Sequence, residues 1–200
     1  MPTPSRQSKY EAVAAHRLSG VILVLENIHD PHNAAAIMRS AESLGIQHLW
    51  LICETVEVWD PKVIGKKSAT FANKWLDFEI FKTSKEAIKQ LKEADFTLFG
   101  TMLDENATPL QSADFTKASN IALIMGNEKS GLSRAMQKAL DHKIYIPMYG
   151  FTQSFNVSVA CAICLWELSH QRQSKNMILD QVAQTRLIEQ FKETQKLNAK

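Results

Sequence analysis

The segment 27–45, NIHDPHNAAAIMRSAESLG, places His29, Asp30 and His32 within four positions, followed by three alanines and an arginine. Histidine and carboxylate side chains are common metal ligands. The two histidines, however, stand on either side of Pro31 without the i, i+4 spacing that places two ligands on one helix face, and no third ligand is evident. We therefore expect no metal at this segment.

Asp30 and Pro31 instead predict the start of a helix. An aspartate accepts a hydrogen bond from a free amide of the first turn, and proline lacks the amide that would be unpaired there. Apolar side chains then recur at helical spacing and predict a buried stripe: Ala34, Ile37, Met38, Ala41 and Leu44. The opposite face is expected to place small side chains in front of one guanidinium: His32, Ala35, Ala36 and Arg39. A surface arginine without a role is the alternative for this position.

A second segment, IMGNEKSGLS at 124–133, places Gly126 and Gly131 around Asn127 and Glu128. It follows an apolar run and precedes a helical pattern, and strand-to-helix turns of open α/β sheets commonly contact ligands. Its spacing does not match a phosphate-binding P-loop. A turn with a purely structural role explains this segment equally well.

A third segment, IPMYGFTQSFNVSVA at 146–160, has polar residues between an expected strand and an apolar helix. Gln153, Ser154 and Asn156 cluster there. Asn156 is either an ordinary N-cap of that helix or part of a site. Cys161 and Cys164, which follow within the same helix, form a C-x-x-C inside an apolar run, which favours buried small residues over a redox pair.

Apolar and amphipathic runs alternate along the chain. Strands are expected at 20–28, 47–54, 96–103, 120–126 and 143–148, and helices at 31–44, 84–95, 132–142, 157–173 and 177–196. Strands separated by helices predict an α/β protein with a mainly parallel sheet covered by helices on both faces. We expect an N-terminal helical extension at 1–19, one main domain at 20–172 and a C-terminal helical extension at 173–200.

Composition restricts the class of protein. The 200 residues are 45% hydrophobic, enough for one sizeable core. No apolar run approaches the ~18 residues of a membrane helix, and the first 20 residues lack the apolar part of a signal peptide. Three cysteines are too few for a disulfide framework. We therefore expect no membrane association and a cytoplasmic location.

The net charge of +2 is unevenly distributed. Both ends of the chain are basic, whereas the middle is slightly acidic. Basic ends favour binding to a polyanion, although solvated helix faces explain such charges about as well. The candidate contacts with nucleic-acid phosphates are Arg6, Lys9, Arg17, Lys192 and Lys196.

Together, the three segments resemble motifs 1, 2 and 3 of the SpoU (TrmH-like) branch of the SPOUT RNA methyltransferases, in the same order. The similarity extends over residues 18–172. Motif 1 opens with H-x-P-H-N and motif 3 contains QSxNVSVA, which is most similar to the members that methylate a guanosine ribose in the tRNA D-loop. Ala35 and Phe155 depart mildly from the family pattern, and Phe155 affects the expected packing around the cofactor.

The resemblance implies a deep C-terminal trefoil knot, one of the rare exceptions to the rule against knots. It also implies an S-adenosylmethionine cofactor bound in the knot loops and a homodimer whose two subunits complete the site. Matched position by position, the implied cofactor-binding residues are Thr101, Met102, Gly126, Ile146, Met148 and Phe155.

The implied reaction is attack of an RNA ribose 2′-hydroxyl on the cofactor methyl group. Arg39 matches the catalytic arginine of the family. Because arginine stays protonated in proteins, we expect it to act mainly as an electrostatic partner of the developing alkoxide and a neighbouring phosphate. Four supporting polar positions are implied as well: Asn33, Glu128, Ser154 and Asn156.

Three alternatives stay open. Ribosomal RNA is a competing substrate, although only a short segment precedes the first expected strand. A noncatalytic RNA-binding member of the family would not need Arg39, Glu128 and Asn156 together, and all three are present. A Rossmann-type dinucleotide enzyme is disfavoured, because the first expected strand is not followed by G-x-G-x-x-G.

Overall fold

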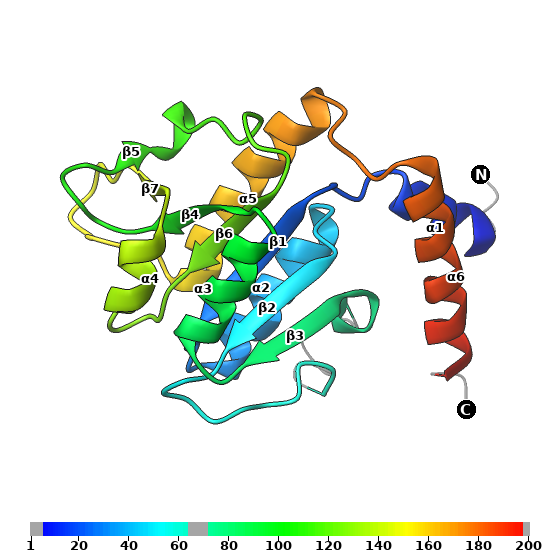
Figure 1. The fold of residues 1–200 in the computed structure, drawn as a ribbon, viewed down its shortest axis with the longest axis horizontal. Helices are drawn as coiled ribbons and strands as arrows, with labels where there is room; N and C mark the ends of the chain where they lie inside the picture. The colour runs from blue at the N-terminus through cyan, green and yellow to red at the C-terminus, as the bar shows by residue number, and fades with distance from the viewer. Residues whose placement is uncertain (1–5, 64–71, 198–200) are drawn as a thin grey trace.

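The computed structural model describes residues 6–63 and 72–197. Within these residues, a seven-stranded sheet has the strand order β3-β2-β1-β6-β4-β7-β5 (Figure 1). Every pair of neighbouring strands is parallel, so the mainly parallel sheet expected from the sequence is confirmed. The strands are β1 Val21–Glu26, β2 His48–Ile52, β3 Asp77–Phe81, β4 Thr97–Thr101, β5 Thr108–Pro109, β6 Ile121–Met125 and β7 His142–Tyr145.

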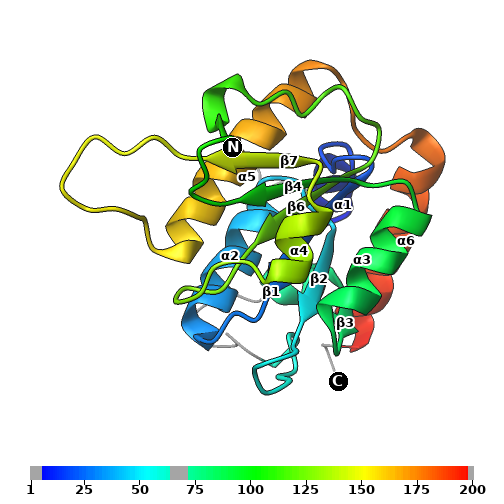
Figure 2. The same cartoon turned by 60° about the vertical axis from the view of Figure 1, so that its left-hand side comes forward.

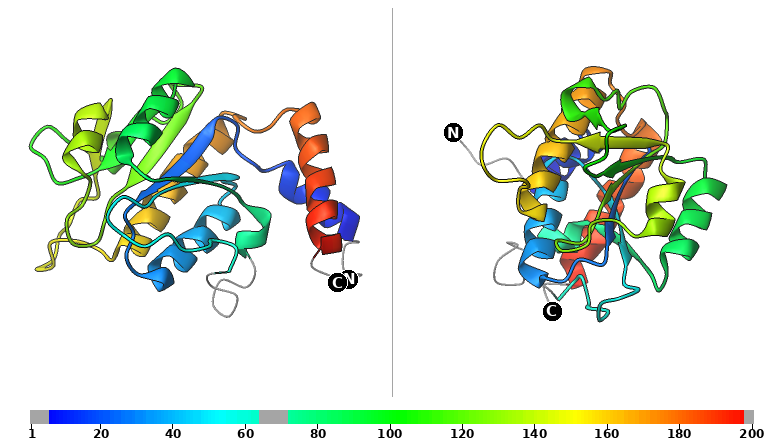
Figure 3. Two further views of the ribbon diagram at one scale, coloured as in Figure 1. Left: turned by 60° about the horizontal axis from the view of Figure 1, so that its bottom comes forward. Right: turned by 90° about the vertical axis from the view of Figure 1, so that its left-hand side faces the viewer.

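Helices cover both faces of the sheet. The right-hand panel of Figure 3 shows α2 and α5 on one side and α3 and α4 on the other. These helices are α2 Pro31–Ser43, α3 Ser84–Glu93, α4 Arg134–Ala139 and α5 Val157–Ser174, and the short 3-10 helices are η1 Ala72–Trp75 and η2 Leu110–Ser112.

The central strand β1 is buried along its whole length. Because successive side chains of a strand point to opposite faces, Leu23 and Leu25 pack in the core beneath α2 and α5, whereas Ile22 and Val24 pack beneath α3 and α4. Burial on both faces explains why this strand reads as an uninterrupted apolar run.

Two helices, α1 Arg6–Ala14 and α6 Gln181–Leu197, lie side by side beyond the amino-terminal end of β1 (Figures 1 and 3). Tyr10 of α1, Trp75 of η1 and Phe191 of α6 form an aromatic cluster with ring centroids 5.4–6.0 Å apart. Leu187 is buried in the same cluster. We call α1, α6 and this cluster the terminal module.

The structure corrects three expectations. Strand β3 was not predicted, because its sequence DFEIF is short and mostly half-exposed, without a continuous apolar run. Strand β5 was not predicted either, because it has only two residues, Thr108 and Pro109. The last helix begins at residue 181 rather than 177, because residues 177–179 pair with the chain before β1: Ser19 donates to the Met177 carbonyl and Leu179 to the Arg17 carbonyl. The trefoil knot and the domain boundaries remain predictions.

Candidate active site

The three motif segments meet at one edge of the sheet. They follow β1, β6 and β7, and the carboxyl ends of parallel strands lie at the same edge, where open α/β sheets bind ligands. We call residues 27–39, 126–133 and 146–156 the site edge.

The first segment begins α2 as its sequence predicts. Asp30 is the N-cap and accepts a hydrogen bond from the His32 amide at 2.8 Å, and Pro31 is the first helical residue. The expected stripe packs into the core, with Leu44 partly buried. One position differs: Ala35 is 2% exposed and belongs to the core face rather than to the open face, because α5 packs close to α2.

A chain of hydrogen bonds joins one polar side chain from each motif. The Asn33 side-chain amide donates to Glu128 Oε1 at 2.9 Å, and the Asn156 side-chain amide donates to Asn33 Oδ1 at 3.0 Å. Asn156 also accepts from the Ser158 amide at 2.8 Å and caps α5. Asn156 is therefore both the N-cap and a member of the cluster, the two alternatives left open by its sequence.

Glu128 is the charged member of this chain. Burial raises the pKa of its carboxyl, but hydrogen bonds from Asn33 and from the backbone amides of Glu128, His29 and Asp30 outweigh burial and hold the pKa below its usual value. The Glu128 carboxylate is therefore ionised at neutral pH. It holds Asn33 in place by accepting a hydrogen bond from the Asn33 side-chain amide.

Arg39 lies on the exposed face of α2, and no hydrogen bond or ion pair to it occurs in the described part of the chain. Ala36 and Ser40, on the same face, line a groove of about 480 Å³ between α2 and α5. The wall from α5 includes Ser158, which is bonded to Asn156, and Trp166, which is 62% exposed. The Arg39 guanidinium is therefore exposed and unpaired among the described residues, on the helix face that lines this groove.

The second segment forms a compact turn organised by Asn127, which sequence reasoning did not single out as a site residue. Its amide donates to the Gly131 carbonyl and its carbonyl accepts from the Gly131 amide. Its side chain accepts from the amides of Lys129 and Ser130 and donates to the Asn27 carbonyl at 2.6 Å. A local signal existed, since Asn commonly bonds to the backbone two residues ahead in turns.

Gly126 begins this turn. A Cβ atom at this position would lie 2.4 Å from the Gly131 carbonyl carbon and 2.5 Å from the Leu132 amide nitrogen. The turn therefore folds back onto its own first residue, and only glycine permits so close an approach.

The remaining expected cofactor residues lie at the carboxyl end of β4 and in the segment between β7 and α5. Thr101 ends β4, the neighbour of β6, and the Met102 amide donates to the Ile144 carbonyl of β7 at 3.0 Å. Ile146 and Met148 follow β7 and are partly buried. Phe155 is 41% exposed.

The third segment runs outside the body of the protein between β7 and α5 (Figure 2). Tyr149 and Phe151 are almost completely exposed. Ser154 is exposed too and makes no hydrogen bond with the described residues. The structure thus connects Asn33, Glu128 and Asn156 directly, and leaves Arg39 and Ser154 nearby but uncontacted.

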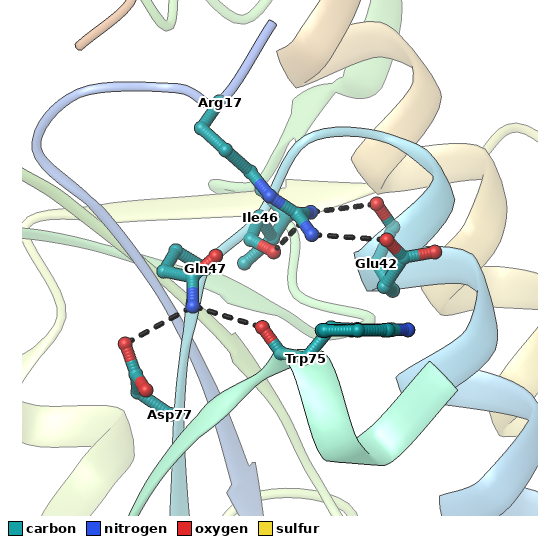
Figure 4. Close-up of polar contacts among 6 residues, drawn as sticks. All are labelled: Arg17, Glu42, Ile46, Gln47, Trp75 and Asp77. Atoms are coloured by element: carbon teal, nitrogen blue, oxygen red, sulfur yellow. Dashed lines mark hydrogen bonds and ion pairs between the residues drawn. The ribbon is translucent and has the colours of Figure 1, made fainter. Parts of the chain in front are cut away.

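Arg17 was expected at an RNA surface, and the structure corrects this. It is 1% exposed and donates to the carbonyls of Glu42 and Ile46 at 2.7 and 3.0 Å and to the Glu42 carboxylate at 2.9 Å (Figure 4). Burial lowers the pKa of Arg17, partly offset by Glu42. The end of α2 supplies these acceptors, so the residue anchors α1 to the body and cannot reach a phosphate.

The other four basic candidates remain accessible. Arg6, Lys9 and Lys196 are exposed, and Lys192 is partly exposed and paired with Glu189 at 2.7 Å. Cys161 and Cys164 are fully buried, and burial raises the pKa of Cys164 to about 12 and that of Cys161 well above its usual value, so the interpretation as apolar core residues is confirmed.

In residues 6–63 and 72–197, no three His, Cys, Asp or Glu side chains are grouped to hold a metal ion. In the same ranges no helix is both long and apolar enough to span a membrane.

The model of the SpoU rRNA Methylase family matches residues 20–166. The chain belongs to this family. A relative, the tRNA (guanosine(18)-2'-O)-methyltransferase of Thermus thermophilus, is 35% identical over 170 residues, covering 85% of this chain and 84% of the relative.

Two solved SpoU structures have a similar fold. The Aquifex aeolicus TrmH/SpoU tRNA modifying enzyme has a TM-score of 0.79 at 26% identity and covers 94% of this chain and 96% of its own. The SpoU methyltransferase AviRb from Streptomyces viridochromogenes, in complex with AdoMet, has a TM-score of 0.66 at 28% identity and covers 79% of this chain and 62% of its own.

Proposed function

We propose that this protein transfers a methyl group from S-adenosylmethionine to a ribose 2′-hydroxyl of RNA, at a guanosine of the tRNA D-loop. The observation that carries the proposal is the hydrogen-bonded chain from Glu128 through Asn33 to Asn156, which unites the three motifs near the exposed Arg39. Membership of the SpoU family supports the reaction class.

The residues at the site edge fit S-adenosylmethionine, which supplies an electrophilic methyl group on a sulfonium. The Gly126 turn presents backbone groups without a side chain, and backbone amides and carbonyls can bind adenine without a charged residue. Ile146, Met148 and Phe155 supply partly exposed apolar surface, and Thr101 and Met102 end the adjacent strand. The AdoMet complex of the related AviRb supports this assignment.

Arg39 acts as a fixed positive charge beside the reacting ribose. Removing the proton from a 2′-hydroxyl creates negative charge, and a guanidinium that is already in position stabilises that charge without reorganising. Glu128 and Asn156 hold Asn33 between them, so this amide can orient the ribose. We assign Ser154 to the same supporting role.

We propose transfer RNA rather than ribosomal RNA as the substrate, because of how much of the chain matches a tRNA modifying enzyme. The Aquifex aeolicus tRNA modifying enzyme matches this chain over nearly the whole length of both proteins, so the match includes at least part of the terminal module. In our proposal, Arg6, Lys9, Lys192 and Lys196 of that module grip tRNA phosphates and leave selection of the nucleotide to the site edge. We also propose a cytoplasmic location.

We further propose a homodimer formed through the groove between α2 and α5. Its exposed side chains are mostly small or apolar, and Trp166 would be largely removed from water by a second copy. The groove adjoins Arg39 and Asn156, so the partner would complete the site. Trp166→Lys should convert the dimer to a monomer in sedimentation experiments, and an unchanged mass would contradict this interface.

The test of the function is incubation with labelled S-adenosylmethionine and total RNA, followed by mapping of ribose methylation. We expect label at one D-loop guanosine of tRNA. Label in ribosomal RNA alone would contradict the substrate, and no label in any RNA would contradict the reaction.

A further inference from the structure

We propose that Glu26 is a positioning residue, whose buried carboxylate holds the loop that we assign to S-adenosylmethionine. This inference rests on the proposed function. Glu26 lies outside the three motifs, and its role follows from the contacts that it and the next residue, Asn27, make with that loop.

Glu26 is the last residue of β1 and is completely buried. A buried carboxylate requires hydrogen-bond donors. Its Oε1 accepts from the Ser133 hydroxyl at 2.7 Å and from the Ser84 hydroxyl at 2.5 Å, and its Oε2 accepts from the Ser133 amide at 2.8 Å. Ser133 thus donates twice to the same carboxylate.

Ser133 joins the cofactor loop to α4. It is the N-cap of that helix and its hydroxyl accepts from the Met136 amide at 3.1 Å. It directly follows residues 126–132. At the other end of this loop, Asn127 donates to the carbonyl of Asn27, the residue after Glu26. The end of β1 therefore holds the loop at both of its ends.

Asn27 supports this arrangement with an unusual backbone conformation. Its φ of 54° lies in the left-handed region, which Asn tolerates better than most residues. Its side chain accepts from the amides of Glu54 and Thr55. The chain after β2 thereby fixes Asn27, and Asn27 and Glu26 together place the loop that carries Glu128.

The contact between Glu26 and Ser84 joins β1 to α3 and not to the cofactor loop. Ser84 begins α3, and its hydroxyl also lies 2.8 Å from a Glu54 carboxylate oxygen. One hydroxyl proton serves only one of these two carboxylates at a time. The Ser84 amide donates to Glu54 as well, so α3 keeps a connection without Glu26. The Ser133 and Ser84 contacts can therefore be removed separately.

The experiment compares Glu26→Ala, Glu26→Gln, Ser133→Ala and Ser84→Ala in the full chain. S-adenosylmethionine affinity is measured by calorimetry, loop order by hydrogen exchange of residues 126–133, and global stability by thermal unfolding. We expect Glu26→Ala and Ser133→Ala to weaken affinity about tenfold, which is about 1.4 kcal/mol, and to speed exchange in the loop. Glu26→Gln keeps an acceptor for the Ser133 amide and should restore most of the affinity.

Ser84→Ala is the matched control. It should lower the unfolding temperature while leaving the affinity within about twofold of the wild type. Equal losses of affinity in Ser133→Ala and Ser84→Ala, or no loss in either, would overturn the proposal. If Glu26→Ala does not fold, the comparison of these two serine variants is the deciding test. A wild-type protein that fails to bind S-adenosylmethionine contradicts the proposed function itself, whereas normal binding by every variant overturns only the role of Glu26.

Discussion

The site edge and the terminal module lie at opposite ends of β1, and an arginine of contrasting environment lies at each end. Arg39 at the site edge is exposed, without a partner among the described residues, whereas Arg17 beside the terminal module is buried against three acceptors of α2 and the turn that follows it. Six strand residues separate the two regions by about 20 Å.

The contrast between Arg39 and Arg17 shows that arginines of this fold have different environments at the two ends of the sheet. At the site edge, amide side chains and one carboxylate bond to each other, and Arg39 is exposed without a partner among the described residues, as its proposed role requires. At the terminal module, aromatic packing and Arg17 attach two helices to the body, and basic side chains on the outer surface of α1 and α6 remain accessible for the RNA contacts that we propose. Replacing Arg39 should therefore lower activity, whereas replacing Arg17 should lower the free energy of unfolding.

The largest effect is expected for Arg39→Ala. Turnover should fall on the order of 100-fold or more, about 3 kcal/mol, because the developing alkoxide loses its positive partner. Thermal unfolding and S-adenosylmethionine affinity should stay near the wild-type values, since the side chain supports no other described residue. Single-turnover kinetics at saturating tRNA is the measurement, and near-normal turnover would remove Arg39 from the mechanism.

Arg17→Gln should have the opposite signature. Its loss leaves the Glu42 and Ile46 carbonyls and the Glu42 carboxylate without their buried donor, which should lower the free energy of unfolding by about 3 kcal/mol. Denaturant titration measures this. Arg6→Gln, on the exposed surface of α1, is the control and should change stability by less than about 0.5 kcal/mol. Similar stability of the two variants would show that Arg17 is not an anchor.

Gly126→Ala tests the tight turn at the site edge. The new Cβ would overlap the backbone of Gly131 and Leu132, so the turn must open, and we expect S-adenosylmethionine affinity to fall at least about tenfold. Gly150→Ala is a matched control, because a Cβ there meets only open space. Calorimetric titration that finds equal affinities for the two variants would place the cofactor away from this turn.

The smallest effects concern the outer charges of the terminal module. Replacing Arg6, Lys9, Lys192 or Lys196 with Gln should weaken tRNA binding, and each replacement should flatten the slope of log K against log[salt] by ~0.7–0.9, because one fewer phosphate is neutralised. Cofactor affinity should not change. Lys89→Gln, on the exposed surface of α3, is the control. An unaltered slope with the fold and the oligomeric state preserved would show that these residues do not bind the RNA backbone.

Much of the fold follows from local patterns in the sequence. The burial of β1, the cap by Asp30 and the core position of Cys161 and Cys164 each depend on a few adjacent residues, and each prediction is confirmed. The two edge strands were not predicted, because β3 has a half-exposed pattern that resembles a loop in sequence and β5 has only two residues.

The candidate site was only partly accessible to the same reasoning. The three motif segments and Asn33, Glu128 and Asn156 stand out by residue type and by family resemblance, but nothing local indicates that their side chains are bonded in one chain. Glu26 reads as the polar end of an apolar strand. Its partners Ser84 and Ser133 are separated from it by 58 and 107 positions, so only the fold reveals the contact.

Local sequence was sufficient to predict the central strands and most helices, because propensity, periodicity and capping act within one or two turns of chain, whereas the edge strands β3 and β5 were not predicted. Tertiary structure alone decided which of two arginines is buried and which is free, since their partners come from distant segments. A guanidinium is buried where folding brings carbonyls and a carboxylate around it, as the end of α2 and the turn after it do for Arg17. Arg39 stays in solvent because it lies on the open face of α2 with the small side chains of Ala36 and Ser40, where no described residue is bonded to it.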